Sequence, residues 1–327
     1  MSISPQWIGA STPERKEAFE RALTVAAAGS VLLQTFINRT VQQLHLRELG
    51  ASAVLDRKPG SGNAAYVNRR TPGTDAEWLA DTSEPTTAEG TYAQVSFPYK
   101  TLVTRGTVTR KLQATGRSYG DILGGEISGR TGDFSETFEG GLITGDIAVD
   151  ANQFDGLITL TQLTASQIVL QTTAVTGDAL TLEKLDETID KVKGSAARAD
   201  LVILASYKGR RLLNAALQAQ QQFNDMVEIG AGFRVRTYDG IPMVTTTEMP
   251  DVLTFDGATI TAYSGSTTTA ILIVNKRYVW IEELTGLTVM PLAKRSSQFD
   301  EFDLFWDGSV VMANTLGAAI LVGIDAA

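Results

Sequence analysis

The chain has 327 residues, a formal net charge of −9 and a sequence pI near 4.8. Hydrophobic residues make up 43% of it and the mean hydropathy is near zero, which is enough for one large domain or two interleaved ones to bury a core. It has no cysteine and one histidine, His45, which excludes disulfides and thiol nucleophiles and leaves catalytic triads and histidine metal sites without their residues. We therefore expect no enzyme activity, no metal and no cofactor.

The acidic composition and the N-terminus exclude further classes of protein. Specific binding to duplex DNA usually requires a basic face, and none is visible in this sequence. Residues 1–10 lack the basic start of a signal peptide, and the charged residues 13–17 stand where its apolar core would lie. No run reaches the roughly 18 apolar residues of a membrane span. The most apolar stretch, residues 310–324, is interrupted by polar residues and a glycine.

The N-terminal segment is predicted to be helical with little core of its own. Thr12 and Pro13 form a helix start, as N-cap and first helical residue, and the helix is expected over residues 13–28. A second apolar segment follows at residues 31–49. Residues 1–58 carry seven cations and five anions, a net charge of about +2, which we interpret as an ordinary solvated helix surface. This segment is expected to lie on another surface as an arm.

A two-stranded ribbon is predicted next. Residues 64–70 form one strand, residues 71–90 are polar and rich in turn residues, and residues 91–110 alternate as the long return strand. Trp78 and Leu79 are the only large apolar pair in the polar tip. Because an isolated two-stranded ribbon is marginal in water, it needs a partner surface. We expect Trp78 and Leu79 to contact a neighbouring subunit.

A helix dotted with glycines follows at residues 119–142. Its apolar side chains fall on one stripe, and each glycine in a helix interior costs about 1 kcal/mol relative to alanine. The stripe loses its phase near Gly129 and Gly132. Two interpretations remain open for this point: a hinge in a continuous helix, or a helix broken by a loop at residues 129–132.

The remainder of the chain is predicted to be a compact α/β part. Residues 150–179 are interpreted as short strands and loops. An amphipathic helix is expected at 181–193, a buried strand at 201–205, and a helix capped by Ser206 from 207 to 222. Further strands are predicted at 233–238, 241–246, 271–274, 278–281, 287–290, 302–306, 310–313 and 316–324.

No motif in the compact part points to chemistry. Gly230-Ala231-Gly232 is a fragment of a dinucleotide fingerprint, but it precedes a strand where that motif must follow one. We interpret three carboxylates as a solvated edge or a subunit-facing salt bridge rather than as metal ligands: Asp300, Glu301 and Asp303. Three cations early in a helix are interpreted as a solvated face, with a subunit contact or an anion as the alternative: Lys208, Arg210 and Arg211.

Five short motifs lie in a fixed order along the chain, and each of them alone is weak. They are residues 46–49 leading to 66–69 (Leu-Arg-Glu-Leu and Tyr-Val-Asn-Arg), Glu136 with Glu139, Gly140, Leu142 and Gly145-Asp146, residues 153–157 (Gln-Phe-Asp-Gly-Leu), residues 201–213, and residues 239–244 (Asp-Gly-Ile-Pro-Met-Val) followed by Met249-Pro250. Their order, and the order of the predicted elements, resembles the major capsid protein of tailed double-stranded-DNA bacteriophages, which has the HK97-type fold.

The resemblance implies an α+β fold with four parts. These are an N-terminal arm (1–55), an extended two-stranded E-loop (56–104), a peripheral (P) domain with a long spine helix and long strands (105–146 and 276–313), and an axial (A) α/β domain (147–275 and 314–327). Trp78 and Leu79 then form the E-loop tip, and Gly129 with Gly132 the hinge of the spine helix.

The sequence departs from the family pattern in two ways, and these limit which family properties can be expected of this chain. Some members cross-link their shells through an E-loop lysine, but no lysine occurs between Pro59 and Tyr99, so no cross-link is expected. Some members begin with a long scaffolding region. Here Met1 lies only about a dozen residues before the first predicted arm helix, so we expect a separate scaffolding protein or none.

The resulting prediction is a structural protein that self-assembles into hexamers and pentamers of an icosahedral phage head around double-stranded DNA. Its partners would be other copies of itself, a scaffolding protein, a portal, a decoration protein and weakly held DNA, with no membrane. It would assemble in the host cytoplasm and reside in the virion. An encapsulin-type compartment shell is the alternative with the same fold. A small carboxylate hydrolase and a surface adhesin are disfavoured by the residue content and by the missing secretion signal.

Overall fold

The computed structural model describes residues 50–71, 76–87, 89–116, 121–192, 198–219, 226–228, 234–293 and 298–326. The helices predicted at residues 13–28 and 31–49 lie outside these residues, and so does the glycine pair at 230–232. The remaining predicted elements can be compared with the structure.

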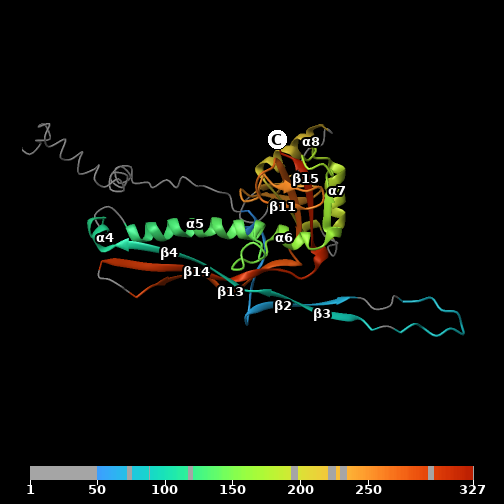
Figure 1. Ribbon diagram of the computed structural model, residues 1–327, viewed down its shortest axis with the longest axis horizontal. Coiled ribbons are helices and arrows are strands. Elements are labelled where there is room, and N and C mark those ends of the chain that lie inside the picture. Colours follow the sequence, from blue (N-terminus) through green and yellow to red (C-terminus); the bar gives the residue numbers. More distant parts are fainter. Residues whose placement is uncertain are drawn as a thin grey trace, which may run out of the picture.

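Figure 1 shows three parts of different shape. An elongated unit contains long strands and the helix α5 (Ile122–Thr144). A compact unit contains a seven-stranded sheet with helices α7 (Leu182–Lys191) and α8 (Tyr207–Ala219). A ribbon of two antiparallel strands, β2 (Ala64–Thr71) and β3 (Thr91–Pro98), projects away from both.

The elongated unit is built on a four-stranded sheet in the order β1-β13-β14-β4. β13 pairs antiparallel with β14, and β14 with β4, whereas β1 is parallel to β13. Helix α4 (Arg110–Gly116) follows β4, and α5 then runs along the sheet (Figure 1). The strands are β1 (Arg57–Pro59), β13 (Val279–Pro291), β14 (Phe299–Met312) and β4 (Lys100–Thr109).

The strands of this sheet differ in length from the sequence prediction. Residues 278–281 and 287–290 were expected as two strands but belong to the single strand β13, because two register shifts around Thr285 interrupt its alternation. The strands predicted at residues 302–306 and 310–313 likewise belong to the single strand β14. The predicted strand at residues 91–110 is two strands, because β3 pairs with β2 in the ribbon whereas β4 pairs with β14.

Helix α5 is continuous, so the alternative of a loop at residues 129–132 is wrong. The Asp121 side chain caps its start by accepting the N–H of Gly124 at 3.0 Å. The second half of the predicted apolar stripe is buried, with Phe134 and Phe138 each 5% exposed. We attribute the continuity to this cap and to the packing, which together offset the intrinsic cost of the glycines.

The seven-stranded sheet divides the core of the compact unit into two clusters. Leu201 and Ile203 of β6 pack in the cluster that contains α7 and α8, whereas Val202 and Leu204 pack in the cluster that contains α5 and α6 (Leu157–Gln162). The strands, in sheet order, are β5 (Ile168–Leu170), β15 (Ala318–Asp325), β12 (Thr268–Asn275), β6 (Leu201–Ala205), β9 (Ile241–Thr245), β8 (Arg234–Tyr238) and β7 (Met226–Glu228).

Several predictions for the compact unit are confirmed. The strand at residues 201–205 is fully buried, and the Ser206 hydroxyl accepts the N–H of Gly209 at 2.9 Å at the start of α8. Asp239 and Gly240 both have positive φ, 49° and 76°, as the hairpin turn between β8 and β9 requires. The short helix α6 was missed, since its six residues are too few to reveal a helical period. A small pair of strands, β10 (Thr254–Phe255) and β11 (Ile260–Ala262), completes the unit.

The paired strands of the ribbon are fixed to the elongated unit. Arg69 donates to the carbonyl oxygens of Met312 and Ala313 at 2.6 and 2.9 Å, and the Tyr99 hydroxyl donates to Glu282 Oε1 at 2.6 Å. Phe97 is buried with the core, 8% exposed, whereas the strand residues beyond it are mainly exposed. The ribbon is therefore anchored at one end only.

Two glycines bring the end of α5 close to the start of α6. The Gly156 N–H donates to the carbonyl oxygen of Gly145 at 2.8 Å. A Cβ on Gly156 would stand 2.6 Å from the Gly145 nitrogen and 2.8 Å from the Ile143 carbonyl oxygen. These are backbone atoms, which cannot move away by a change of rotamer, so only glycine fits at this crossing.

We predict that Gly156→Ala lowers the free energy of unfolding by about 2 kcal/mol, because the added methyl group forces the two backbones apart. Gly125→Ala is the control, since a Cβ there meets nothing within 4 Å. That change should raise stability by about 1 kcal/mol. Urea denaturation of both variants measures the difference, and equal stability of the two would contradict the crossing.

A second prediction concerns pH. Burial raises the pKa of Tyr99 to about 12, and the hydrogen bond to Glu282 adds to the rise. The folded protein thus holds this proton more tightly than the unfolded chain, whose tyrosines titrate near pH 10. The resulting stability is complete below about pH 10 and is lost as the pH rises through about 12. Tyr99→Phe should flatten the alkaline loss of stability seen in urea titrations, whereas Tyr92→Phe, on the exposed ribbon, should keep the parental profile.

Candidate assembly surfaces

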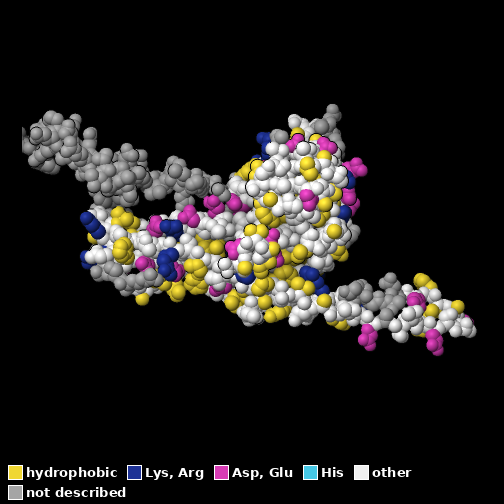
Figure 2. All heavy atoms as spheres, in the orientation of Figure 1, with side chains coloured by type: hydrophobic (Ala, Val, Ile, Leu, Met, Phe, Trp, Pro, Cys, Tyr) yellow, Lys and Arg dark blue, Asp and Glu magenta, His cyan; other side chains and the backbone are white. Residues whose placement is uncertain are grey.

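The tip of the ribbon carries the predicted contact residues in an exposed position. The Trp78 side chain is fully exposed, and Leu79 is 46% exposed. Residues 71–99 carry five acidic side chains and no basic one, and Figure 2 shows carboxylates along the far part of the ribbon. The tip is thus an acidic surface with an aromatic side chain at its centre. Its contact with a neighbouring copy stays a prediction.

The proposed hinge residues lie on a different part of the molecule. Gly129 and Gly132 are in the middle of α5, and the structure does not bring them near Trp78 or Leu79. A Cβ on Gly129 would meet nothing within 4 Å, so the glycine is not required there for space. A role in bending is therefore compatible with its surroundings and stays a prediction.

The three carboxylates on β14 do not form a metal site. Asp303 accepts two hydrogen bonds from Arg105 of the neighbouring β4, at 2.7 and 2.8 Å, and this ion pair raises the pKa of the guanidinium. Asp300 and Glu301 lie beside it on the same strand. Among the residues that the structure describes, no three acidic or histidine side chains are grouped to hold a metal ion. The predicted salt bridge is present, but within the chain.

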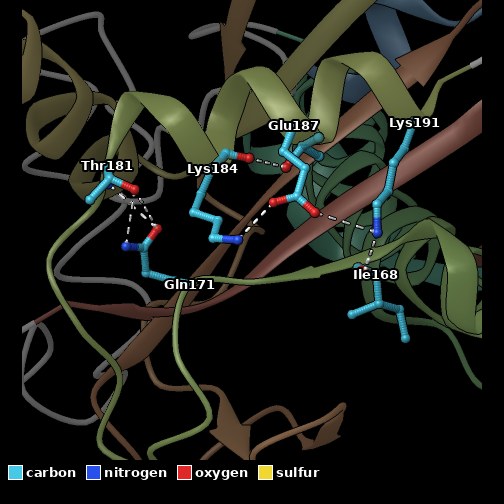
Figure 3. Close-up of polar contacts among 7 residues, drawn as sticks. Ile168, Gln171, Thr181, Lys184, Glu187 and Lys191 are labelled. Carbon is cyan, nitrogen blue, oxygen red and sulfur yellow. Dashed lines mark hydrogen bonds and ion pairs between the residues drawn. The ribbon is translucent and has the colours of Figure 1, made fainter.

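The outer face of the compact unit carries exposed ion pairs on α7. Figure 3 shows Glu187 between Lys184 and Lys191, at 2.7 and 3.9 Å, with Lys191 also donating to the Ile168 carbonyl oxygen. The hydrogen bond from Lys184 lowers the pKa of Glu187. Each of these three charged groups has a partner within the chain, as is usual for ion pairs on a solvated helix face.

The three cations of α8 lie on its first turns, as the sequence indicated. The Arg210 guanidinium carbon is 5.2 Å from the centre of the Tyr207 ring, which is close enough for a weak cation–π contact. The alternatives for Lys208 and Arg211 are a solvated face, a subunit contact or a bound anion, and these stay open. In the described part of the chain no helix has the length and the apolar character needed to cross a membrane.

A buried carboxylate joins three segments of the chain. Glu139 of α5 has no exposed surface, and its Oε1 accepts the N–H of Ala51 at 2.6 Å and the hydroxyl of Thr246 at 3.1 Å. Its Oε2 accepts the N–H of Ser52 at 2.9 Å. Glu139 belongs to one of the five short motifs in the sequence, but this role was not predicted. The signal was a glutamate on the apolar face of a helix, one residue after the buried Phe138.

The family model described as "Phage capsid family" matches residues 29–301. No curated protein sequence matches the chain.

Solved structures share the fold over nearly the whole chain. The SrpI encapsulin of Synechococcus elongatus PCC 7942 is 15% identical, with a TM-score of 0.65 over 90% of this chain and 95% of that one. The capsid of an empty GTA particle is 16% identical, with a TM-score of 0.63 over 92% and 98%. The capsid protein of cyanophage A-1(L) is 14% identical, with a TM-score of 0.63 over 87% and 95%.

These findings confirm the predicted α+β, HK97-like fold and the resemblance to phage capsid proteins, which are structural shell proteins and not enzymes. The family model covers most of the sequence, from residue 29 to residue 301, and the chain therefore belongs to the phage capsid family.

Proposed function

We propose that the chain assembles into hexamers and pentamers that form an icosahedral phage head around double-stranded DNA. The observation that carries the proposal is the ribbon, which is anchored at one end and presents a fully exposed tryptophan at the other. A tryptophan in water with no contact in its own chain gains its burial only on another molecule. In a family of shell proteins, that molecule is another copy.

The shape of the chain supports large contacts between copies. An extended ribbon adds interface without adding core, and obligate interfaces of this kind bury thousands of Å². In this proposal the ribbon docks on a different part of a neighbouring copy, which makes the contact heterologous. Heterologous contacts that close generate rings, and rings of five and six build shells.

In this proposal the domain boundaries are those expected from the sequence: arm 1–55, E-loop 56–104, P domain 105–146 with 276–313, and A domain 147–275 with 314–327. The elongated unit corresponds to the P domain and the compact unit to the A domain. The P domain boundary at 146 agrees with the end of α5 at Thr144.

DNA, a scaffolding protein, a portal and a decoration protein are the further partners proposed. The net charge of −9 supports weak, non-specific contact with DNA, since an acidic chain repels a packed genome and keeps it from adhering. Assembly in the host cytoplasm and residence in the virion follow from the same proposal.

An encapsulin-type compartment is the second candidate, favoured by the shared fold with the SrpI encapsulin. The two candidates differ in cargo, protein in one and DNA in the other. Electron microscopy of the purified protein, followed by nuclease-protected DNA analysis of particles formed in the infected or expressing cell, distinguishes them. A monomer that persists at high concentration would refute both.

We predict that Trp78→Ala combined with Leu79→Ala leaves the fold intact but weakens the shell. The lost burial is worth about 3–5 kcal/mol per copy. Scanning calorimetry of assembled shells should show a lower melting temperature, with unchanged far-UV circular dichroism of the unassembled protein. Val175→Ala, an exposed apolar residue of the compact unit, is the control. If shells of the double variant melt at the same temperature as parental shells, the tip is not part of the interface between subunits.

Mature particles boiled in SDS should release a single band near 35 kDa. The reason is that the ribbon between Pro59 and Tyr99 contains no lysine for an isopeptide bond. A ladder of covalent multimers would contradict this and would implicate Lys58 or Lys100, which flank the ribbon.

Replacing both Gly129 and Gly132 with alanine should stabilise α5 by about 1 kcal/mol per site. If the helix bends there during shell expansion, the double variant shifts the balance between rounded precursor and expanded shells toward the state with the straighter helix. Cryo-electron microscopy of both shell populations measures the shift. Gly125→Ala in the same helix is the matched control, and an identical balance in both variants would exclude the hinge.

A further inference from the structure

The point where residues 1–49 join the rest of the chain is unusually crowded. Gly50 precedes the short helix α3 (Ala51–Val54), and a Cβ on Gly50 would stand 2.5 Å from Val244 Cγ1 and 2.6 Å from the Thr245 carbonyl oxygen. Only glycine fits this space. As a consequence the residue at the N-cap position has no side chain with which to cap the helix.

Glu139 supplies the missing cap from 88 residues further along the chain. Its two carboxylate oxygens accept separately from the N–H groups of Ala51 and Ser52, the first two residues of α3. None of the ion pairs among the described residues involves Glu139. Among the described residues, only uncharged donors bind this carboxylate, and the same hydrogen bonds fix the positions of those donors.

The third bond connects the same carboxylate to the compact unit. Thr246 follows β9, and its hydroxyl donates to Glu139 Oε1 while accepting the N–H of Glu248 at 3.2 Å. Glu139 itself lies on α5, in the elongated unit. One side chain therefore contacts the start of the described chain, the long helix and the loop after β9.

A carboxylate suits this position because it accepts with both oxygens. The amide of glutamine has the same shape, but its –NH₂ group donates, so it can accept from only one of the two N–H groups. The other would be left buried without a partner, which native structures avoid.

We propose that Glu139 is a latch that fixes the position of α3 and couples it to the relative position of α5 and the compact unit. A shift of α5 against the loop after β9 stretches the hydrogen bond between Glu139 and Thr246. Either α3 then moves together with α5, or the hydrogen bonds of the latch break. A change of shell geometry at α5 would thereby reach the arm. This last step rests on the proposed function as a shell protein, whereas the latch itself does not.

The test compares Glu139→Gln with the parent and with Glu136→Gln, which makes the same change one turn earlier in α5. Hydrogen exchange reports on the Ala51 and Ser52 amides. Because the chain has no cysteine, spin labels at Ala53→Cys and Asp133→Cys, both exposed, report the distance between α3 and α5 without background. Electron microscopy of shells reports on assembly. Thr246→Val, which removes one bond of three, should give an intermediate effect.

We expect Glu139→Gln to speed exchange at Ala51 and Ser52 at least tenfold, with the amides of β12 unchanged, to broaden the label distances, and to reduce or change the size of the shells. Parental exchange and distances would overturn the latch. Fast exchange with shells of parental yield and size would overturn the coupling. Failure of the parent itself to form shells would refute the proposed function instead, and exchange and label distances would then decide on the latch alone.

Discussion

The packing of Phe138 against Trp306 is the contact on which the rest of the structure depends. Their ring centres are 4.8 Å apart in an edge-to-face arrangement, and Phe154 lies against both at 6.3 and 6.0 Å. Phe138 comes from α5, Trp306 from β14, and Phe154 from the segment that leads into the compact unit. One aromatic cluster therefore holds the long helix to the long sheet and fixes the point where the chain passes between the two units.

Hydrogen bonds around this aromatic cluster connect it to the root of the ribbon. The Trp306 ring nitrogen donates to Glu283 Oε1 at 2.8 Å, and Arg57 of β1 donates to the same oxygen at 2.6 Å. The adjacent Glu282 accepts from Tyr99 at the root of the ribbon. Because these two glutamates are consecutive residues of β13, the orientation of the ribbon is tied to the core although the ribbon contributes little to it.

This division between a rigid core and an unsupported ribbon explains how one chain can serve in a shell. The core is buried by the chain itself, so the subunit keeps its shape in different surroundings. The ribbon leaves Trp78 exposed at its tip, and under the proposed function the contact with another copy supplies free energy that folding does not. The buried Glu139 adds a directional contact at the start of the described chain, where apolar packing alone would allow sliding.

The sequence by itself determined the composition-based exclusions, the ribbon, the buried strand at residues 201–205, the Ser206 cap and the hairpin turn at Asp239-Gly240. These follow from local rules, namely alternation, capping and turn chemistry, that act within a few residues. The tertiary structure alone decided that α5 continues through Gly129 and Gly132, because the packing that offsets its glycines comes from distant strands. It also decided that residues 278–291 form one strand and that Asp303 pairs with Arg105. Glu139 is the clearest case: its role depends on Ala51, Ser52 and Thr246, and only the folded chain brings these four residues together.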